Sequence, residues 1–460
     1  MKAGFGVYSI TPRVGVELCG FGPYHNRKSV GIHDLLEARV GAFEAGGRTT
    51  VIVTCDLCGL GDPGVASIRS VICAKHPELR PGDIMVCCSH THSGPATSDR
   101  ECDQCWGRFD PTWYSILPYR IAEAAYQALE NMTEVKVSQA LVPCRHIGLN
   151  RVYDKDNPPL EDVLKEDWEP AKPECTDTEC RVIRFDTVEG NKLIGFMAYF
   201  GCHPVCCCDD NHYITGDYPG VAMHNLMREF PGSVGMFLQG AMGDVNSGCV
   251  YKKEQESLLA LDVFAARFAN AVRNGLDQAK EIPVDSIRNV SRRFKFKTKQ
   301  VFTREWIEKI RSEQSAILLR ADADEAAWKT RTAACYLRCL DKVEDLLRQP
   351  DGHGIEAEMQ LIRMGGLEFI GAPFEIMQAI KNEVHAKSAA EFPMLISLAD
   401  GSHGYAPDNQ SLTATKLRGD YAAYATITVA LMGCRLPYAD IHNELVKYSL
   451  ELEKEAGGRE

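Results

Sequence analysis

The segments "TTVIVTCDLCGL" (residues 49–60), "GVASIRSVICAKH" (64–76) and "DIMVCCSH" (83–90) predict a strand, a helix and a second strand, in that order. The first and third are short apolar runs that end in polar residues, whereas the apolar residues of the second recur with helical spacing. Helices alternating with buried strands are typical of α/β proteins. We therefore predict an α/β fold with a mixed β-sheet core flanked by helices.

The same alternation continues along the rest of the chain. Further elements are expected as a helix at 114–132, a hairpin at 180–204, a strand at 234–246, a hairpin at 358–375 and a final helix from residue 441. Residues 303–348 are charged on one side and apolar on the other, which predicts a helical insertion. The Pro- and acid-rich segment 151–179 is expected to form a surface loop. We expect one domain over residues 1–460.

Composition narrows the class of protein. With 45% hydrophobic residues the 460-residue chain can bury a core, and a net charge of −12 offers no basic surface for nucleic acid. No run of about 18 apolar residues predicts a membrane-spanning helix, and the N-terminus lacks the charged and apolar regions of a secretory signal. A soluble, cytoplasmic protein without stable membrane association is expected. Nothing in the sequence predicts its oligomeric state.

The chain has 19 cysteines, many of them in apolar runs where a free thiol packs as a small hydrophobic group. Without an export signal, reduced thiols are expected. The pairs Cys55/Cys58 and Cys102/Cys105 have the spacing of a structural zinc site, which is a weaker alternative because the first pair lies in a strand-like run. The run Cys206–Cys208 has no explanation at this level.

Candidate metal ligands follow three of the predicted strands. In "CCSHTHSGP" (residues 87–95), an extended backbone would point His90 and His92 to the same side. His203 follows a second apolar strand, and Glu375 follows a third and is expected to begin a helix. Two imidazoles and a carboxylate are a common ligand set for catalytic zinc with one position open. The alternative is chance, since a chain with 13 histidines places some of them at strand ends.

Seven short blocks carry a resemblance to a known family. In chain order they are "GIHDLLEARV", "SHTHSGP", "GCHPV", "ITGDYPG", "LQGAMGDVN", "GAPFE" and "GYAPDN". They resemble the successive blocks of the catalytic domain of the neutral/alkaline non-lysosomal ceramidases, over a span from the N-terminus to about Tyr421. The resemblance implies a single Zn²⁺ held by His90, His203, Glu375 and Tyr405. It places His92 beside the metal-bound water or the substrate carbonyl.

The resemblance also implies a tyrosine that helps to hold the scissile carbonyl, and an arginine in a block that ends in Asn-Arg, for which Tyr421 and Arg151 are the nearest matches. A surface or core role is the alternative for each. Asp56 and Asp217 end or follow strands near the same blocks, so each could orient a ligand histidine or cap a turn.

One block departs from the family at a catalytic position. Where the ceramidases carry a serine with an assigned catalytic role, this chain has Asn246, and Ser247 follows it. An amide cannot serve as the nucleophile of an acyl-enzyme. We therefore expect zinc-activated water to attack, with His92, Tyr421 or Arg151 stabilising the oxyanion and transferring a proton.

A second departure concerns the substrate. Ceramidases of this type carry an additional C-terminal β-sandwich domain, whereas this chain ends in a predicted helix soon after Tyr421. We therefore expect hydrolysis of an amide bond in a small soluble N-acyl compound, not in ceramide. The alternatives are a zinc-dependent hydrolase of a lactone, an ester or a sugar derivative, and a non-catalytic homologue. A thiol-rich metal-handling protein is weaker still.

Overall fold

The computed structural model describes residues 1–22, 27–98, 106–154, 158–348, 353–412 and 424–457. Within them the largest sheet has nine strands. These are β1 (Lys2–Ser9), β3 (Glu37–Ala45), β4 (Arg48–Cys55), β5 (Ile84–Cys88), β6 (Thr133–Pro143), β8 (Glu179–Thr187), β9 (Leu193–Phe200), β11 (Val234–Gln239) and β13 (Lys280–Ile282). Their order is β11-β9-β8-β6-β1-β3-β4-β5, with β13 paired to β6. Parallel pairs β4/β5 and β9/β11 stand beside antiparallel ones, so the predicted mixed sheet is confirmed.

A second sheet packs face to face on the first. Its strands, in order, are β14 (Ile287–Phe296), β15 (Ile355–Met364), β16 (Leu367–Gly371) and β18 (Phe392–Ile396). Phe5 and Met85 of the large sheet share one buried cluster with Phe369 and Met394 of the small one. The hairpin expected at 358–375 is β15 and β16, but the sequence did not predict that it belongs to a separate sheet.

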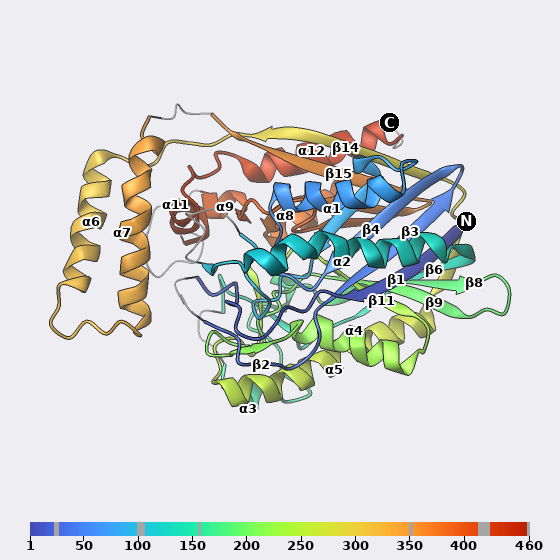
Figure 1. Cartoon of the computed structure of the whole chain (residues 1–460), viewed down its shortest axis with the longest axis horizontal. Helices are drawn as coiled ribbons and strands as arrows, with labels where there is room; N and C mark the ends of the chain where they lie inside the picture. The colour runs from blue at the N-terminus through green and yellow to red at the C-terminus, as the bar shows by residue number, and fades with distance from the viewer. Residues whose placement is uncertain (23–26, 99–105, 155–157, 349–352, 413–423, 458–460) are drawn as a thin grey trace.

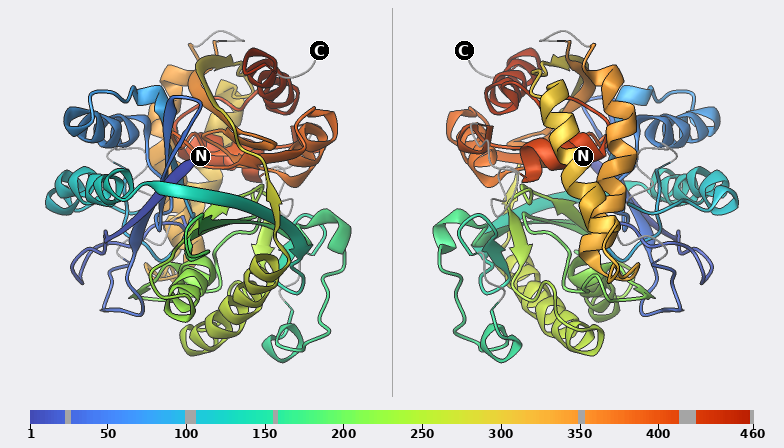
Figure 2. Two further views of the ribbon diagram at one scale, coloured as in Figure 1. Left: turned by 90° about the vertical axis from the view of Figure 1, so that its right-hand side faces the viewer. Right: turned by 90° about the vertical axis from the view of Figure 1, so that its left-hand side faces the viewer.

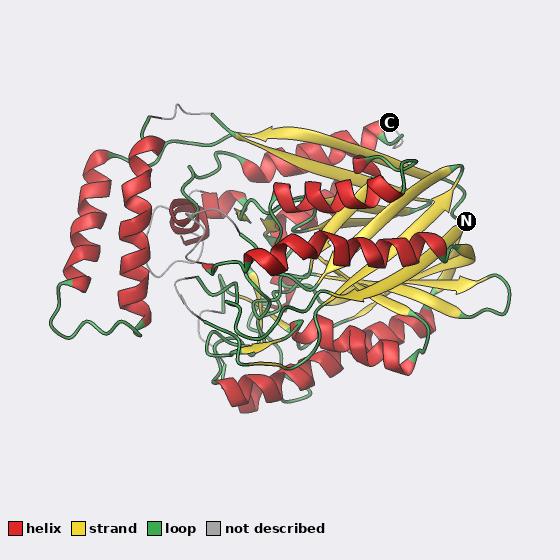
Figure 3. Cartoon of the chain, in the orientation of Figure 1, coloured by secondary structure: helices red, strands yellow, loops and turns green. Residues whose placement is uncertain are grey.

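Helices cover the two outer faces of this pair of sheets (Figures 2 and 3). On the large sheet lie α1 (Asp62–Lys75), α2 (Pro111–Glu130), α4 (Asp217–Glu229) and α5 (Glu254–Gln278), and on the small sheet lie α8 (Gln378–Lys387) and α12 (Ile441–Glu455). The sheets are buried on both faces, which explains the nearly continuous apolar runs of β4 and β5. None of the described helices combines the length and the apolar character needed to cross a membrane.

The insertion predicted at 303–348 is a pair of helices, α6 (Arg304–Leu318) and α7 (Trp328–Leu346), at one end of the molecule (Figure 1). The side chain of Thr303 caps α6 by accepting a hydrogen bond from the Trp306 backbone N–H. Apolar residues of both helices share a buried cluster with α11 (Val429–Met432). The α/β fold class with its helical insertion is confirmed, whereas the single-domain organisation stays a prediction.

Short elements join the loops that follow the long strands. They are β2 (Gly31–Ile32), β7 (Gly148–Asn150), β10 (Tyr213–Ile214), β12 (Val245–Ser247), β17 (Glu375–Ile376), β19 (Tyr405–Ala406), α3 (Leu160–Val163) and α9 (Asn409–Leu412). They form the two-stranded pairs β10/β2, β12/β7 and β17/β19. The Cys88 backbone N–H donates to the Leu398 carbonyl, and the Leu398 N–H donates to the Phe374 carbonyl, which joins the loops after β5, β16 and β18. The candidate ligands lie in these loops.

Candidate metal centre

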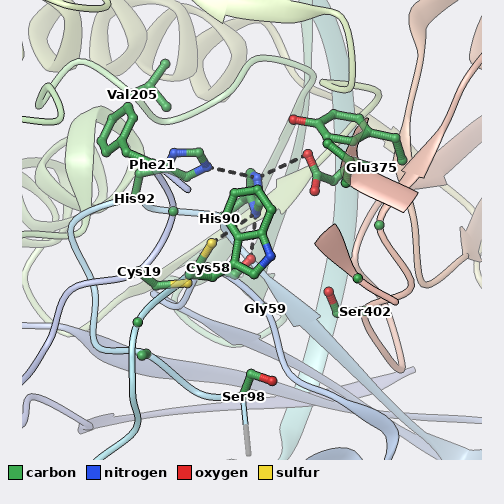
Figure 4. Close-up of a pocket in the computed structure, with 18 of the residues that line it drawn as sticks. Cys19, Phe21, Cys58, Gly59, His90, His92, Ser98, Val205, Glu375 and Ser402 are labelled. Carbon is green, nitrogen blue, oxygen red and sulfur yellow. Dashed lines mark hydrogen bonds and ion pairs between the residues drawn. The ribbon is translucent and has the colours of Figure 1, made fainter. Parts of the chain in front are cut away.

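Three predicted ligands from distant parts of the chain meet at one point. Glu375 Oε2 lies 3.5 Å from His90 Nε2 and 3.3 Å from His203 Nε2. The ligand atoms of the three residues all lie within 4.8 Å of one another. His203 is fully buried, and Figure 4 shows the Glu375 carboxylate pointing at His90.

The other ring nitrogen of each histidine is held by the backbone. His90 Nδ1 donates to the Cys58 carbonyl at 2.6 Å, and His203 Nδ1 donates to the Met242 carbonyl at 2.6 Å. These bonds fix the tautomer that leaves each Nε2 lone pair free to bind a cation. Burial, and then the charge of Arg151, lower the pKa of His203 to about 3, so its imidazole is neutral at physiological pH.

The local backbone differs from the sequence prediction at two ligands. Strand β5 ends at Cys88, and His90 has a φ of +71° in the following loop, so the alternation of a strand does not bring His90 and His92 together. A turn does so instead, because the left-handed residue reverses the direction of the side chains. Glu375 does not begin a helix. It belongs to β17, and α8 begins three residues later at Gln378.

The pairing of β17 with β19 places Tyr405 beside Glu375, since the two residues are register partners. Arg151 Nη2 donates to the Tyr405 hydroxyl at 2.9 Å and to the Gly243 carbonyl at 2.7 Å, and it lies 3.4 Å from His203 Nε2. The predicted residues Tyr405 and Arg151 therefore both lie next to the cluster.

His92 also reaches the cluster, with its Nε2 3.1 Å from His90 Nε2. Its ring stands edge-on to Phe21, at 4.9 Å between centroids, and rests on Gly20. A Cβ at Gly20 would lie 2.3 Å from His92 Cγ, and φ there is +119°, so the position requires glycine. Burial, and then the neighbouring His90, lower the pKa of His92 well below its usual value.

Asn246 lies on the same wall, in β12, where it forms a β-bridge with His203. Its side chain is buried, and its Oδ1 has no hydrogen-bond partner among the described residues. It borders the cavity described below. Tyr421 falls outside the described residues, so its predicted contact with the carbonyl stays a prediction.

Asp56 and Asp217 do not orient the ligand histidines. The Asp56 carboxylate accepts two hydrogen bonds from Arg39, at 2.8 and 2.9 Å. Asp217 accepts the backbone N–H groups of Cys206 and Cys207. Backbone carbonyls orient the ligand histidines instead. The sequence cannot indicate which carbonyls do so, because every residue carries one.

The sequence also missed the position of Cys58. Its Sγ lies 3.6 Å from His90 Nδ1, and Cys58 forms a second group of possible ligands with His90 and His92. The cysteines that the structure describes are all free thiols, as expected, whereas Cys102 and Cys105 lie outside the described residues. The signal for Cys58 was its place just after a buried strand.

A cavity of about 1010 Å³ opens over the cluster. Its wall includes His90, His92 and Glu375 together with apolar and aromatic side chains. The aromatic residues are Phe21, Trp106, Tyr114, Tyr251, Trp328 and Tyr405. A ligand in this cavity would lie against the candidate metal ligands.

The cluster fits a bound transition-metal ion. It offers two imidazole nitrogens and one carboxylate oxygen, the donor types of catalytic zinc, and the cavity leaves space for a further ligand. Both imidazoles have the tautomer that binding requires. The donor set would suit other divalent transition metals as well.

Comparison with known proteins finds a matching family and similar folds. The sequence profile described as "Neutral/alkaline non-lysosomal ceramidase, N-terminal" matches residues 1–266. The fold is similar to the crystal structure of neutral ceramidase from Pseudomonas aeruginosa, with a TM-score of 0.73 and 18% identity over 99% of this chain and 74% of that chain. It is also similar to a ceramidase complexed with C2, with a TM-score of 0.72 and 16% identity over 100% and 76% of the respective chains. No curated protein matches the chain.

Proposed function

Since the chain belongs to the neutral/alkaline non-lysosomal ceramidase family, we propose that it is a zinc-dependent hydrolase that cleaves an amide bond in a small soluble N-acyl compound. The observation that carries the proposal is the convergence of His90, His203 and Glu375 on one point in the wall of a large cavity. A bound Zn²⁺ would polarise a carbonyl and lower the pKa of a water molecule toward neutrality.

Each ligand residue would contribute differently to the binding of the ion. The two Nε2 atoms would bind the ion as neutral donors, and the Glu375 carboxylate would offset part of its positive charge. We propose Tyr405 as the fourth ligand, because it is the register partner of Glu375. Arg151 holds the Tyr405 hydroxyl by a hydrogen bond.

Two further side chains are proposed to contact the reacting groups. His92 Nε2 lies beside the centre and can move a proton between the attacking water and the leaving amine. The amide of Asn246 can donate a hydrogen bond to the oxyanion that develops on the carbonyl. Tyr421 would add a second donor if it lies as the family resemblance predicts.

The cavity is large enough to hold an N-acyl compound of small-molecule size. Its volume of about 1010 Å³ is at the upper end of the range for small-molecule sites. Aromatic side chains in the wall suit an acyl chain, and the polar cluster suits the amide. The ligand residues His90, Glu375 and Tyr405 line an open cavity. This favours an enzyme over a non-catalytic homologue, in which protein side chains would close off the metal centre.

We expect the zinc-loaded protein to hydrolyse N-acyl amines in a panel that also contains lactones, simple esters, glycosides and a short-chain ceramide. Chelation should abolish turnover, and Zn²⁺ should restore it, because no other described group can polarise the carbonyl as strongly. Product release followed by chromatography is the measurement. Turnover of lactones or glycosides alone would refute the amide assignment, and turnover of ceramide in preference to small amides would refute the substrate size.

Replacing Asn246 with alanine should lower kcat by about 10²- to 10³-fold and leave the zinc content unchanged, because one oxyanion donor is lost while the nucleophile is kept. Steady-state kinetics and metal analysis check this. Complete loss of turnover with zinc retained would show that Asn246 is indispensable and that the proposed attack by water is incomplete. Asn246→Asp is the companion variant: it keeps the size of the side chain but replaces the N–H donor with a carboxylate oxygen, whose negative charge repels the oxyanion, so kcat should fall at least as far.

A further inference from the structure

Arg435 lies in the wall of the catalytic cavity and is held there by packing. Its guanidinium stacks on the ring of Tyr438, 4.7 Å from the centroid. Its Nη2 occupies the space beside Gly404, where a Cβ would lie only 2.5 Å away. Gly404 also has a φ of +75°, so glycine is required there for two reasons. The side chain is therefore placed before any ligand arrives.

This position is close to the candidate metal centre. The Gly404 carbonyl accepts a hydrogen bond from the Glu375 backbone N–H at 2.9 Å, and Gly404 immediately precedes Tyr405. Ser402 and His403, which come just before it, also line the cavity. His403 is held by Asp62, 2.9 Å from its Nε2. Ser402, His403 and Arg435 thus form a polar part of the cavity wall beside the metal ligands.

Among the described residues, no carboxylate pairs with Arg435, and no acceptor bonds its side chain. Arg151, the other arginine of the cavity wall, is by contrast bonded to the Tyr405 hydroxyl and the Gly243 carbonyl. Among the residues that the structure describes, the cavity wall therefore contains one half-buried, positioned cation with unused donors. Such a guanidinium favours an anion that can accept two parallel hydrogen bonds.

We propose that Arg435 binds a carboxylate of the substrate, so that the hydrolase acts on N-acyl amino acids in preference to neutral N-acyl amines. This inference rests on the proposed function for the cleavage itself, but the binding of the carboxylate can be measured without cleavage. The amide carbonyl lies at the metal centre, the acyl chain lies along the aromatic wall, and the amino-acid carboxylate reaches the guanidinium.

The test uses two ligands that cannot be hydrolysed. One is the ketomethylene analogue of N-hexanoylglycine, in which CH₂ replaces the amide N–H, and the other is the primary amide of that analogue, which lacks the negative charge. Calorimetric titration of the full chain should show tighter binding of the carboxylate form. Arg435→Met should weaken binding of the carboxylate form by about 10- to 100-fold, as expected for loss of a charged hydrogen bond, and weaken binding of the primary amide much less, because its carbonyl is a neutral acceptor.

Two variants complete the design. Arg435→Lys should keep part of the preference, because it keeps the charge and loses the two parallel donors. Arg288→Met, at an exposed position on β14, should change neither affinity. An unchanged affinity ratio in Arg435→Met, with the primary amide still bound, would overturn the proposal. If the protein binds the carboxylate form preferentially but hydrolyses no amide, the carboxylate-binding site at Arg435 stands and only the proposed function is refuted.

Discussion

Replacing His90 with alanine is expected to remove bound zinc and to lower the hydrolytic rate by more than about 10³-fold, equivalent to over 4 kcal/mol of transition-state stabilisation. His90 Nε2 is one of three donor atoms, and its loss leaves only His203 and Glu375. It also removes the imidazole that His92 contacts. Metal analysis by mass spectrometry and steady-state kinetics measure the two effects together.

The matched control is His353→Ala. His353 is exposed and is not among the residues of the cavity wall, so its replacement should change neither zinc content nor rate. Full zinc occupancy in the His90→Ala protein would refute the ligand assignment. Zinc loss with unchanged turnover would refute the metal-dependent mechanism.

The second large effect is on stability. Arg69→Met is expected to lower the free energy of unfolding by about 3–5 kcal/mol, because it leaves a buried charge without its partner. Arg69 Nη2 lies 2.8 Å from Asp400 Oδ1, and Nη1 lies 2.9 Å from Glu358. Asp400 is fully buried at its side chain. Arg69 lies on α1, over the large sheet, and Glu358 lies on β15 of the small sheet, so this arginine connects the two halves of the fold.

The loss of stability in Arg69→Met should depend on pH. Burial raises the pKa of Asp400 to about 7, although Arg69 opposes the shift, so the pKa should rise further without Arg69. Between the unfolded value, about 3.9, and the native value, the folded chain binds the additional proton. Stability therefore falls as the pH rises through this interval. Arg69→Met should accordingly be closer to the wild type at pH 5 than at pH 8.

Urea unfolding at the two pH values measures both effects. Arg348→Met is the control, because Arg348 is 78% exposed and its contact with Asp345 is a surface ion pair, worth at most about 1 kcal/mol. A shift in Arg69→Met no larger than that of the control would show that the Arg69–Asp400 contact does not stabilise the packing of the two sheets.

The sequence predicted which residues form the ligand set better than it predicted the backbone conformation that brings them together. Apolar runs that end in His90, His203 or Glu375 are local features, and the family resemblance added Tyr405 and Arg151, which the structure places beside them. The strand alternation expected to align His90 with His92 was wrong, because one positive φ in the loop sets their directions. No local sequence pattern predicts a positive φ at a histidine.

The amino-acid sequence by itself determined the fold class and the chemical types of the donors, since both follow from residue type and from spacing along the chain. Only the tertiary structure decided that β14, β15, β16 and β18 form a second sheet, and that carbonyls of Cys58 and Met242 orient the histidines. It alone placed Arg435 in the cavity wall without a carboxylate partner among the described residues. These features join residues far apart in sequence, and the free energy that selects them comes from packing and from burial of charge, which local patterns do not encode.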